Sequence, residues 1–252
     1  MAKRGHRPSQ AQGNRPRFWG RHAVTAALAN PERTVRKVWG TREALSSLQL
    51  PPVIPIVYAE VTDLARLVPG DAPHQGLVIE VDPLEDVWLG ELLDQGAQDP
   101  EDRPRPLVVL DQVTDPHNVG AIMRSAAAFD ALGIVTQDRH SPPESGALAR
   151  AASGALEVVP WVRVVNLARA LDEIRDANFW RIGLTGAAPQ TLSVILGEQK
   201  KVAIVLGAEG EGMRQNTETH CDELAKLPIS GRVESLNVSN AAAIALYAVA
   251  AR

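Results

Sequence analysis

The sequence of 252 residues contains a single cysteine, Cys221, so an intrachain disulfide is excluded. A chain without disulfides is typical of a reducing compartment. No apolar run reaches the roughly 18 residues of a membrane-spanning helix. The N-terminus carries Lys3, Arg4 and Arg7 and lacks the apolar core of a secretion signal. These absences predict a soluble cytoplasmic protein that has no membrane partner.

The composition is that of an ordinary globular protein, 45% apolar and 22% charged, which excludes wholesale disorder. At roughly 150 residues per domain, the chain can form one large domain or two modest ones. Residues 1–22 hold six basic residues and no acidic one, which leaves 20 basic against 30 acidic residues in the rest. A basic arm favours a polyanion such as nucleic acid, although so short a run can also be a solubilising tail.

The first half of the sequence predicts a disordered basic arm, a small α/β domain and a linker. The arm covers residues 1–16, the domain residues 17–82 and the linker residues 83–105. In the domain, helices are expected at 20–30 and 61–68, and strands at 35–39, 53–58 and 76–81. Within the linker, a short apolar helix at 87–93 precedes a stretch rich in proline and acidic residues.

The second half, residues 106–252, alternates continuous apolar strands with helices, which predicts an α/β domain with a parallel sheet covered on both faces. Strands are expected at 107–110, 133–136, 180–184 and 202–206, and helices at 118–131, 145–155, 166–177 and 213–223. The last helix, from about residue 238 to 252, has no polar face. It must therefore be buried in its own core or against another subunit.

Ligands of open parallel sheets bind beyond the carboxyl ends of the strands, and the end at Asp111–Arg124 is unusual. Asn118 lies near the start of the following helix, where free backbone N–H groups favour an anion. At roughly 100° per residue, Arg124 points away from the apolar face of that helix. The alternative is a helix cap followed by a solvated arginine.

A second unusual strand end lies at Val202–Met213. The apolar strand runs straight into three glycines, Gly207, Gly210 and Gly212. No Gly-Lys-Ser/Thr follows, and Gln215 replaces the third glycine of the dinucleotide fingerprint, which excludes a Rossmann oxidoreductase. Glu209 and Glu211 disfavour a polyphosphate and favour a ligand with a cationic group. The glycines can also be simple turn residues.

The third segment, Leu227–Asn240, leads into the last helix. Ser235 and Asn237 can cap that helix while they offer hydrogen bonds to a ligand. The alternative is plain capping by Ser239 or Asn240.

In this order, the three segments resemble the motifs of the SpoU (TrmH-like) branch of the SPOUT RNA methyltransferases, over about residues 107–252. Asn118 to Arg124 resembles the first motif, Leu206–Met213 the second, and Leu227 through Ser239 the third. In the first half, Phe-Trp-Gly-Arg-His-Ala-Val at 18–24 and His-Gln-Gly-Leu-Val at 74–78 resemble the ribosomal-protein-like, substrate-binding domain of the family's 23S rRNA guanosine 2′-O-methyltransferases.

The resemblance implies methyl transfer from S-adenosylmethionine to a guanosine ribose hydroxyl in the peptidyl-transferase region of 23S rRNA. It implies a homodimer and a trefoil knot in the catalytic domain, contrary to the general rule against knots. The implied active-site residues are Asn118, Arg124, Glu209, Ser235 and Asn237. The implied cofactor contacts are Leu206, Gly207, Ala208, Gly212, Leu227, Ile229 and Leu236. RNA contacts are expected at Arg15, Arg17, Arg21, His22 and His74, and no metal is expected.

These expectations agree with the chemistry of the reactants. S-adenosylmethionine carries a sulfonium, an ammonium and a carboxylate but no phosphate, which suits a glycine loop with carboxylates. A ribose hydroxyl is a poor nucleophile that must be aligned and helped to lose its proton. Because a guanidinium is effectively never neutral, we expect Arg124 to grip the adjacent phosphate and stabilise developing alkoxide charge rather than act as a literal base.

Two alternatives to this function stay open. One is 2′-O-methylation of tRNA or of another rRNA site. Residues 18–81 argue against the tRNA enzyme, because it lacks such a domain. The other is a non-catalytic RNA-binding factor in ribosome assembly, against which the intact Asn118, Arg124 and Glu209 argue.

Overall fold

The computed structural model describes residues 15–97, 105–197, 199 and 201–252, so most of the expected basic arm lies outside the described residues. The chain forms two compact units. The first comprises Met1–Glu85 with Glu144–Arg150, and the second comprises Asp86–Pro143 with Ala151–Arg252. The continuous boundaries expected from the sequence do not include the return of residues 144–150 to the first unit.

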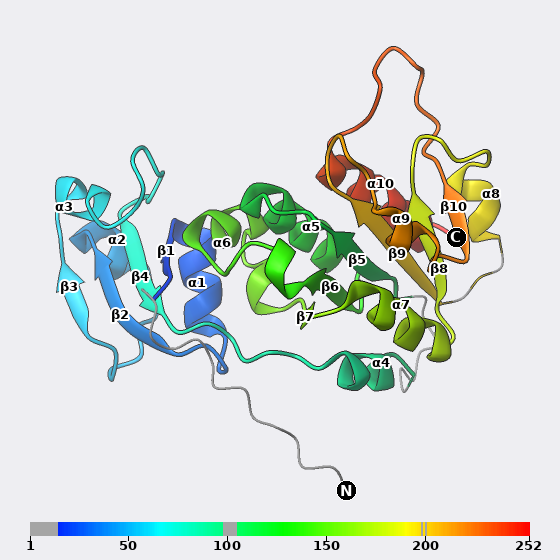
Figure 1. Ribbon diagram of the computed structural model, residues 1–252. Helices are drawn as coiled ribbons and strands as arrows, with labels where there is room; N and C mark the ends of the chain where they lie inside the picture. The colour runs from blue at the N-terminus through cyan, green and yellow to red at the C-terminus, as the bar shows by residue number, and fades with distance from the viewer. Residues whose placement is uncertain (1–14, 98–104, 198, 200) are drawn as a thin grey trace, which may run out of the picture. The chain divides into compact units, whose positions relative to one another are not determined.

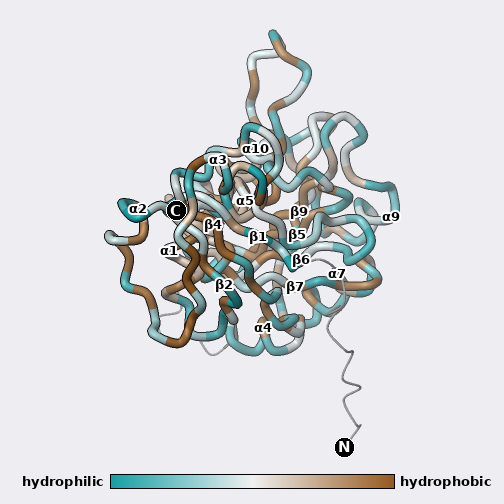
Figure 2. The backbone as a smooth tube through the Cα atoms, turned by 90° about the vertical axis from the view of Figure 1, so that its left-hand side faces the viewer, coloured by the Kyte–Doolittle hydropathy of each residue, from teal (hydrophilic) through white to brown (hydrophobic). Residues whose placement is uncertain are grey.

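The first unit is built on a four-stranded sheet in the order β1-β4-β2-β3 (Figure 1). The strands are β1 (Arg17–Trp19), β2 (Val35–Gly40), β3 (Ile56–Tyr58) and β4 (Leu77–Val81), and the helices are α1 (Arg21–Ala29), α2 (Arg42–Ser46) and α3 (Val61–Ala65). β4 is antiparallel to β1 and β2, whereas β2 and β3 are parallel. The apolar run of β4, brown in Figure 2, is almost wholly buried, as expected of an apolar strand that polar turns bound at both ends.

Residues 144–150 complete the first unit from far along the sequence. Arg33 Nη1 lies 2.7 Å from Glu144 Oε2, and both side chains are almost fully buried. The other oxygen, Glu144 Oε1, accepts a hydrogen bond of 3.0 Å from the Leu84 backbone N–H. Gly146, which begins α6 (Gly146–Ala152), packs so closely on Trp19 that a Cβ atom there would lie 1.8 Å from the indole ring. This segment is therefore part of the core of the first unit.

The second unit contains a six-stranded, wholly parallel sheet in the order β10-β8-β9-β5-β6-β7. The strands are β5 (Leu107–Asp111), β6 (Gly133–Gln137), β7 (Trp161–Val164), β8 (Trp180–Leu184), β9 (Val202–Gly207) and β10 (Glu223–Ala225). The prediction of a parallel sheet is confirmed. The edge strands β7 and β10 were not predicted, because each is only three or four residues long.

Helices cover both faces of this sheet (Figure 1). They are α4 (Leu89–Ala97), α5 (Pro116–Ala128), α7 (Leu167–Asp176), α8 (Leu192–Leu196), α9 (Gln215–Glu218) and α10 (Val238–Ala250), with 3-10 turns η1 (Asp138–His140) and η2 (Ala155–Glu157). α4 and α7 pack with alternate residues of the central strands in one core, and α5 and α10 pack together against the other face. α4 lies within the expected linker, and it buries Leu92 in the core of the second unit.

Within the part of the chain that the structure describes, the last helix is not covered on every side. Ala242, Leu246 and Val249 are buried, but Ile244 is 45% and Tyr247 61% exposed. Tyr247 makes an edge-on contact with Phe129 at the end of α5, with ring centroids 6.1 Å apart. An apolar strip of α10 therefore faces solvent in the single chain.

Candidate active site

The first motif occupies the turn from β5 into α5. Asp115 caps the helix by accepting a hydrogen bond of 3.0 Å from the His117 N–H, and Pro116 follows it at the first helical position. Asn118 therefore lies in the first turn of the helix. Arg124 is exposed, as its position opposite the apolar face predicts, and makes no ion pair or hydrogen bond to any described residue.

The second motif is a loop that folds back on the end of β9. The backbone N–H groups of Ala208 and Gly212 each donate to the other residue's carbonyl, over 3.1 and 3.0 Å. A Cβ atom on Gly207 would lie 2.0 Å from the carbonyl carbon of Gly212, so only glycine fits there. Gly210 and Gly212 adopt φ angles of 80° and 70°, which other residues rarely adopt. The fold-back therefore requires the absence of a side chain at Gly207 and the positive φ angles of Gly210 and Gly212.

Three of the expected active-site residues meet: Asn118 in the first turn of α5, Glu209 after β9, and Asn237 before α10. Asn118 Nδ2 donates to Glu209 Oε1 over 3.2 Å. Asn237 Nδ2 donates to the same Glu209 oxygen and, over 3.0 Å, to Asn118 Oδ1. The backbone N–H of Val238 also donates to Glu209 Oε1, over 3.3 Å. One carboxylate oxygen thus ties together the segments after β5, β9 and β10.

Asn237 also caps α10. Its side-chain oxygen accepts hydrogen bonds from the backbone N–H groups of Ser239, over 2.9 Å, and Asn240, over 3.4 Å. Ser239 and Asn240 are donors to the cap, so the alternative in which either of them caps the helix is wrong. Asn237 serves both as helix cap and as partner of Asn118.

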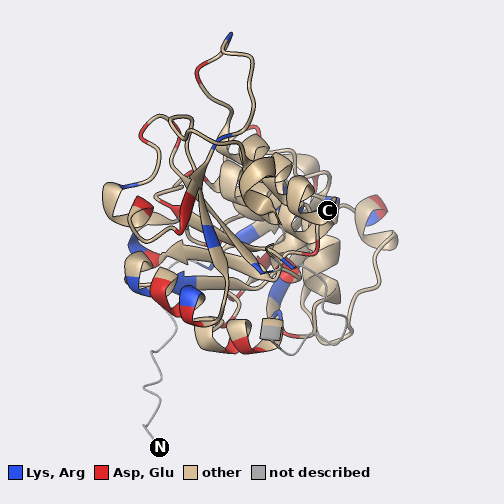
Figure 3. Cartoon of the chain, turned by 90° about the vertical axis from the view of Figure 1, so that its right-hand side faces the viewer, with Lys and Arg blue, Asp and Glu red and all other residues tan. Residues whose placement is uncertain are grey.

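The remaining third-motif residues lie on the long loop between β10 and α10. Leu227 follows β10, Ile229 is 38% exposed, Ser235 is exposed and Leu236 is half-buried. Figure 3 shows this loop projecting from the second unit, with a basic and an acidic residue near its tip. Within the described part of the chain, no hydrogen bond joins Ser235 to Asn118, Glu209 or Asn237.

An ion pair whose carboxylate is fully buried fixes the second-motif loop, and the sequence analysis missed it. Asp111, the last residue of β5, is fully buried. It accepts hydrogen bonds of 2.9 Å from both the backbone N–H and the Nε of Arg214, and Arg214 Nη2 donates to Gln137 over 2.8 Å. The sequence did hold a signal for this pair. A carboxylate directly after four apolar strand residues is expected to be buried, and a buried charge needs a partner.

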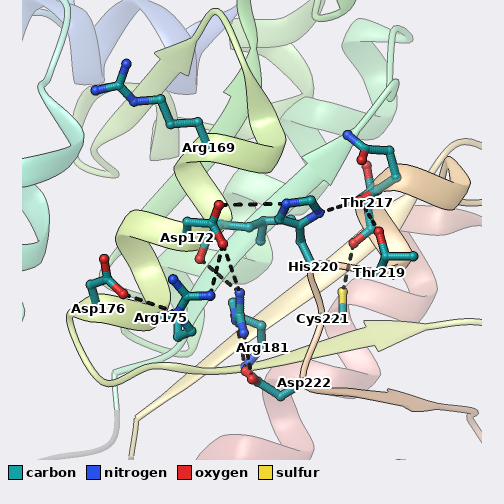
Figure 4. Close-up of polar contacts among 12 residues, drawn as sticks. Arg169, Asp172, Arg175, Asp176, Arg181, Thr217, Thr219, His220, Cys221 and Asp222 are labelled. Carbon is teal, nitrogen blue, oxygen red and sulfur yellow. Dashed lines mark hydrogen bonds and ion pairs between the residues drawn. The ribbon is translucent and has the colours of Figure 1, made fainter.

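A second polar network joins α7 to β8 and to the start of β10 (Figure 4). Arg181 and Asp222 form a two-pronged pair, with Nη2 and Oδ1 2.6 Å apart. Burial tends to raise the pKa of Asp222, but the hydrogen bonds from Arg181 outweigh it and hold that pKa below the ordinary value. Burial raises the pKa of the neighbouring Cys221 thiol to about 12, which leaves it unreactive at neutral pH. This network is structural.

Two of the expected RNA-binding residues are engaged within the first unit. Arg15 Nε lies 2.7 Å from Asp82 Oδ1. Arg17 Nε lies 3.7 Å from Glu80 Oε2, and its guanidinium also lies over the Trp39 ring. Both arginines are therefore partly neutralised by carboxylates.

The other three differ in how far they are open to solvent. Arg21 and His22 are exposed at the start of α1. His74 is 9% exposed, and its Nδ1 accepts a hydrogen bond of 3.2 Å from the Gly76 N–H. His74 therefore shapes the turn before β4 and offers little surface to RNA.

Neither a metal site nor a membrane span is found among the described residues. They contain no cluster of three or more His, Cys, Asp or Glu side chains able to hold an ion. None of their helices combines the length and the apolar character needed to cross a bilayer.

Residues 105–247 match the SpoU rRNA Methylase family. The chain belongs to that family. It is 37% identical to the 23S rRNA (guanosine-2'-O-)-methyltransferase RlmB of Pseudomonas putida, over 92% of this chain and 94% of the relative. It is 38% identical to an uncharacterized tRNA/rRNA methyltransferase of Synechocystis sp., of whose length it spans 63%.

Solved SpoU methyltransferases share the fold. AviRb from Streptomyces viridochromogenes superposes with a TM-score of 0.75 over 94% of this chain and 89% of AviRb, at 21% identity. The same enzyme has been solved with the cofactor AdoMet, and that structure superposes with a TM-score of 0.73. The α/β fold class predicted from the sequence is confirmed, and the segments that resemble SpoU motifs are those that converge on Glu209.

Proposed function

We propose that this SpoU family protein transfers the methyl group of S-adenosylmethionine to the 2′-hydroxyl of a guanosine in 23S rRNA. The observation that carries the proposal is the meeting of Asn118, Glu209 and Asn237, which joins three SpoU motifs at one end of a parallel sheet. Relatives named for this reaction match more than nine-tenths of the chain. A different rRNA site or tRNA is the alternative substrate.

The second-motif loop suits the cofactor. Between Leu206 and Met213 the loop holds two carboxylates and no basic side chain, which favours a sulfonium and an ammonium over a polyphosphate. The close return of Gly212 onto Gly207 leaves backbone groups rather than side chains at the strand end. The residues expected to hold the cofactor are Leu206, Gly207, Ala208, Gly212, Leu227, Ile229 and Leu236. When bound, it supplies an electrophilic methyl group.

Arg124 is the residue we assign to the RNA side of the reaction. It is exposed on α5, the helix that also carries Asn118, and no described carboxylate neutralises it. A guanidinium keeps its proton at neutral pH, so it cannot accept the proton of the ribose hydroxyl. We assign it to gripping the phosphate beside the ribose and to stabilising negative charge that develops on the hydroxyl oxygen.

The proposal extends to assembly. The exposed Ile244 and Tyr247 on α10 favour a homodimer through the second unit, because a second copy would cover this apolar strip. The first unit is proposed to bind RNA, with Arg21 and His22 among its contacts. The trefoil knot of the family stays a prediction. An rRNA substrate implies a protein that works where ribosomes are assembled.

Methyl transfer to defined RNAs tests this function. Purified protein with radiolabelled S-adenosylmethionine is expected to label protein-free 23S rRNA from cells that lack the gene, and to leave rRNA from wild-type cells unlabelled. Labelling of tRNA alone would support the alternative substrate. Uptake of the cofactor without label on any RNA would contradict the proposed function and favour a non-catalytic RNA-binding factor.

A further inference from the structure

The arginines of the first unit fall into two groups. Five of them pair with carboxylates, at distances of 2.5 to 3.7 Å: Arg15, Arg17, Arg33, Arg36 and Arg66. The other three described arginines have no such pair. Arg21 donates to Ser47 Oγ over 2.8 Å, Arg150 donates to Gln75 Oε1 over 3.2 Å, and the guanidinium of Arg42 lies over the ring of Tyr58. Their positive charge is therefore available to an external anion.

The three unpaired arginines lie at one end of the strands of the four-stranded sheet. β1, β2 and β3 all end there, and β4 begins there. The register shows this, since Trp19 pairs with Val78 and Gly40 pairs with both Leu77 and Tyr58. Arg21 follows β1 and Arg42 follows β2. Arg150 lies at the same end, because it donates to the side-chain oxygen of Gln75. That oxygen also accepts a hydrogen bond of 2.9 Å from the Arg21 backbone N–H. We call Arg21, Arg42, Tyr58 and Arg150 the arginine edge.

Tyr58 adds an aromatic surface to this edge. It is the last residue of β3, an edge strand, and it is 61% exposed. The guanidinium carbon of Arg42 lies 4.9 Å from its ring centroid. Its neighbour on β2 is Gly40, which has no side chain to cover the ring. An exposed ring beside an unpaired guanidinium is not needed for the core of this unit, and it can stack on a planar group.

We propose that the arginine edge binds an unpaired segment of RNA, with Tyr58 and Arg42 stacking on a base and Arg21 and Arg150 contacting phosphates. This inference rests on the proposed function and extends it to the structure of the substrate. Bases can stack on a side chain only where they are splayed out of a helix, so the site favours loops and bulges over continuous duplex. Phosphate contacts by unpaired arginines fix the strand without reading its sequence.

Binding of two related RNAs to the full-length protein tests this proposal. Fluorescence anisotropy with a labelled RNA hairpin is compared with the blunt duplex of its stem, and the hairpin is expected to bind more tightly. Tyr58→Leu and Arg42→Gln are each expected to weaken hairpin binding about tenfold, whereas Tyr58→Phe, which keeps the ring, retains it.

Two further variants control for charge. Arg66→Gln removes an exposed arginine that already pairs with Asp63, 3.0 Å away, so its effect on hairpin binding should be below about twofold. Glu43→Gln removes an exposed carboxylate next to Arg42 and should tighten binding.

The outcomes separate this inference from the proposed function. Normal hairpin binding by Tyr58→Leu and Arg42→Gln, with wild-type thermal midpoints and wild-type methyl transfer, would overturn the arginine edge and leave the function intact. Equal binding of hairpin and duplex would overturn the stacking role. A wild-type protein that binds neither RNA and transfers no methyl group would overturn both.

Discussion

The side-chain amide of Asn237 donates a hydrogen bond of 3.0 Å to the side-chain oxygen of Asn118, although the two residues are 119 positions apart. Glu209 accepts from both of them. The contact therefore fixes the relative positions of the helix that carries Arg124 and of the helix that ends the chain. These hydrogen bonds join the three segments that resemble SpoU motifs.

Removing Asn118 should slow methyl transfer without unfolding the protein. Asn118→Ala deletes the donor to Glu209 and the acceptor of the Asn237 amide, but leaves the Asp115 cap of α5 in place. We expect the single-turnover rate to fall about a hundredfold, with a change of about 1 kcal/mol or less in the free energy of unfolding. The control is Asn216→Ala, which removes an exposed amide on α9. A rate near that of the wild type for Asn118→Ala would separate this triad from the reaction.

Arg124→Ala should abolish turnover while S-adenosylmethionine binds normally. The side chain is exposed and makes no ion pair with a described residue, so its loss should affect only the interaction with RNA. Calorimetry with the cofactor and a single-turnover assay with rRNA separate the two effects. Arg169→Ala, which removes an exposed arginine from α7, is the control. Unchanged turnover by Arg124→Ala would remove this arginine from the mechanism.

The sequence alone predicts the elements that carry strong local patterns. The strands at Leu107, Gly133 and Val202 were correct because continuous apolar runs between polar turns allow few other structures. β1, β7, β10, α2 and α8 were missed because three to five residues do not establish a period.

The contacts of the site depend on longer-range relationships. The sequence analysis placed Asn118, Glu209 and Asn237 in three strand-end loops, and the family resemblance named them together. No local pattern predicts their hydrogen bonds, which depend on strand order and loop path. The Asp111–Arg214 pair and the return of Glu144 to the first unit were missed for the same reason.

Gly207→Ala should open the cofactor loop. Its new Cβ atom would overlap the backbone at Gly212 and Met213, which cannot rotate away as a side chain can. We expect a loss of about 1–3 kcal/mol in stability and a much larger loss of affinity for S-adenosylmethionine. Gly186→Ala is the matched control, because nothing lies within 4 Å of its Cβ position. Wild-type affinity in Gly207→Ala would show that the cofactor binds elsewhere.

Glu144→Ala should destabilise the first unit, although residue 144 lies far along the chain. The substitution removes the ion pair of the buried Arg33 with Glu144 and the acceptor of the Leu84 N–H. Breaking a buried pair in this way costs about 3–5 kcal/mol, measurable by urea unfolding. Asp63→Ala, which breaks an exposed pair with Arg66, should cost less than about 1 kcal/mol. Equal effects of the two variants would mean that Glu144 is not part of the core.

The identity of the methylated atom tests the central claim most directly. After reaction with methyl-labelled S-adenosylmethionine, the 23S rRNA is digested completely to nucleosides, which are separated by chromatography and identified by mass spectrometry. We predict that the label lies in a single guanosine, on the 2′-oxygen of its ribose. Label on a base, or on no nucleoside at all, would contradict the claim that these motifs hold a ribose hydroxyl against the methyl donor.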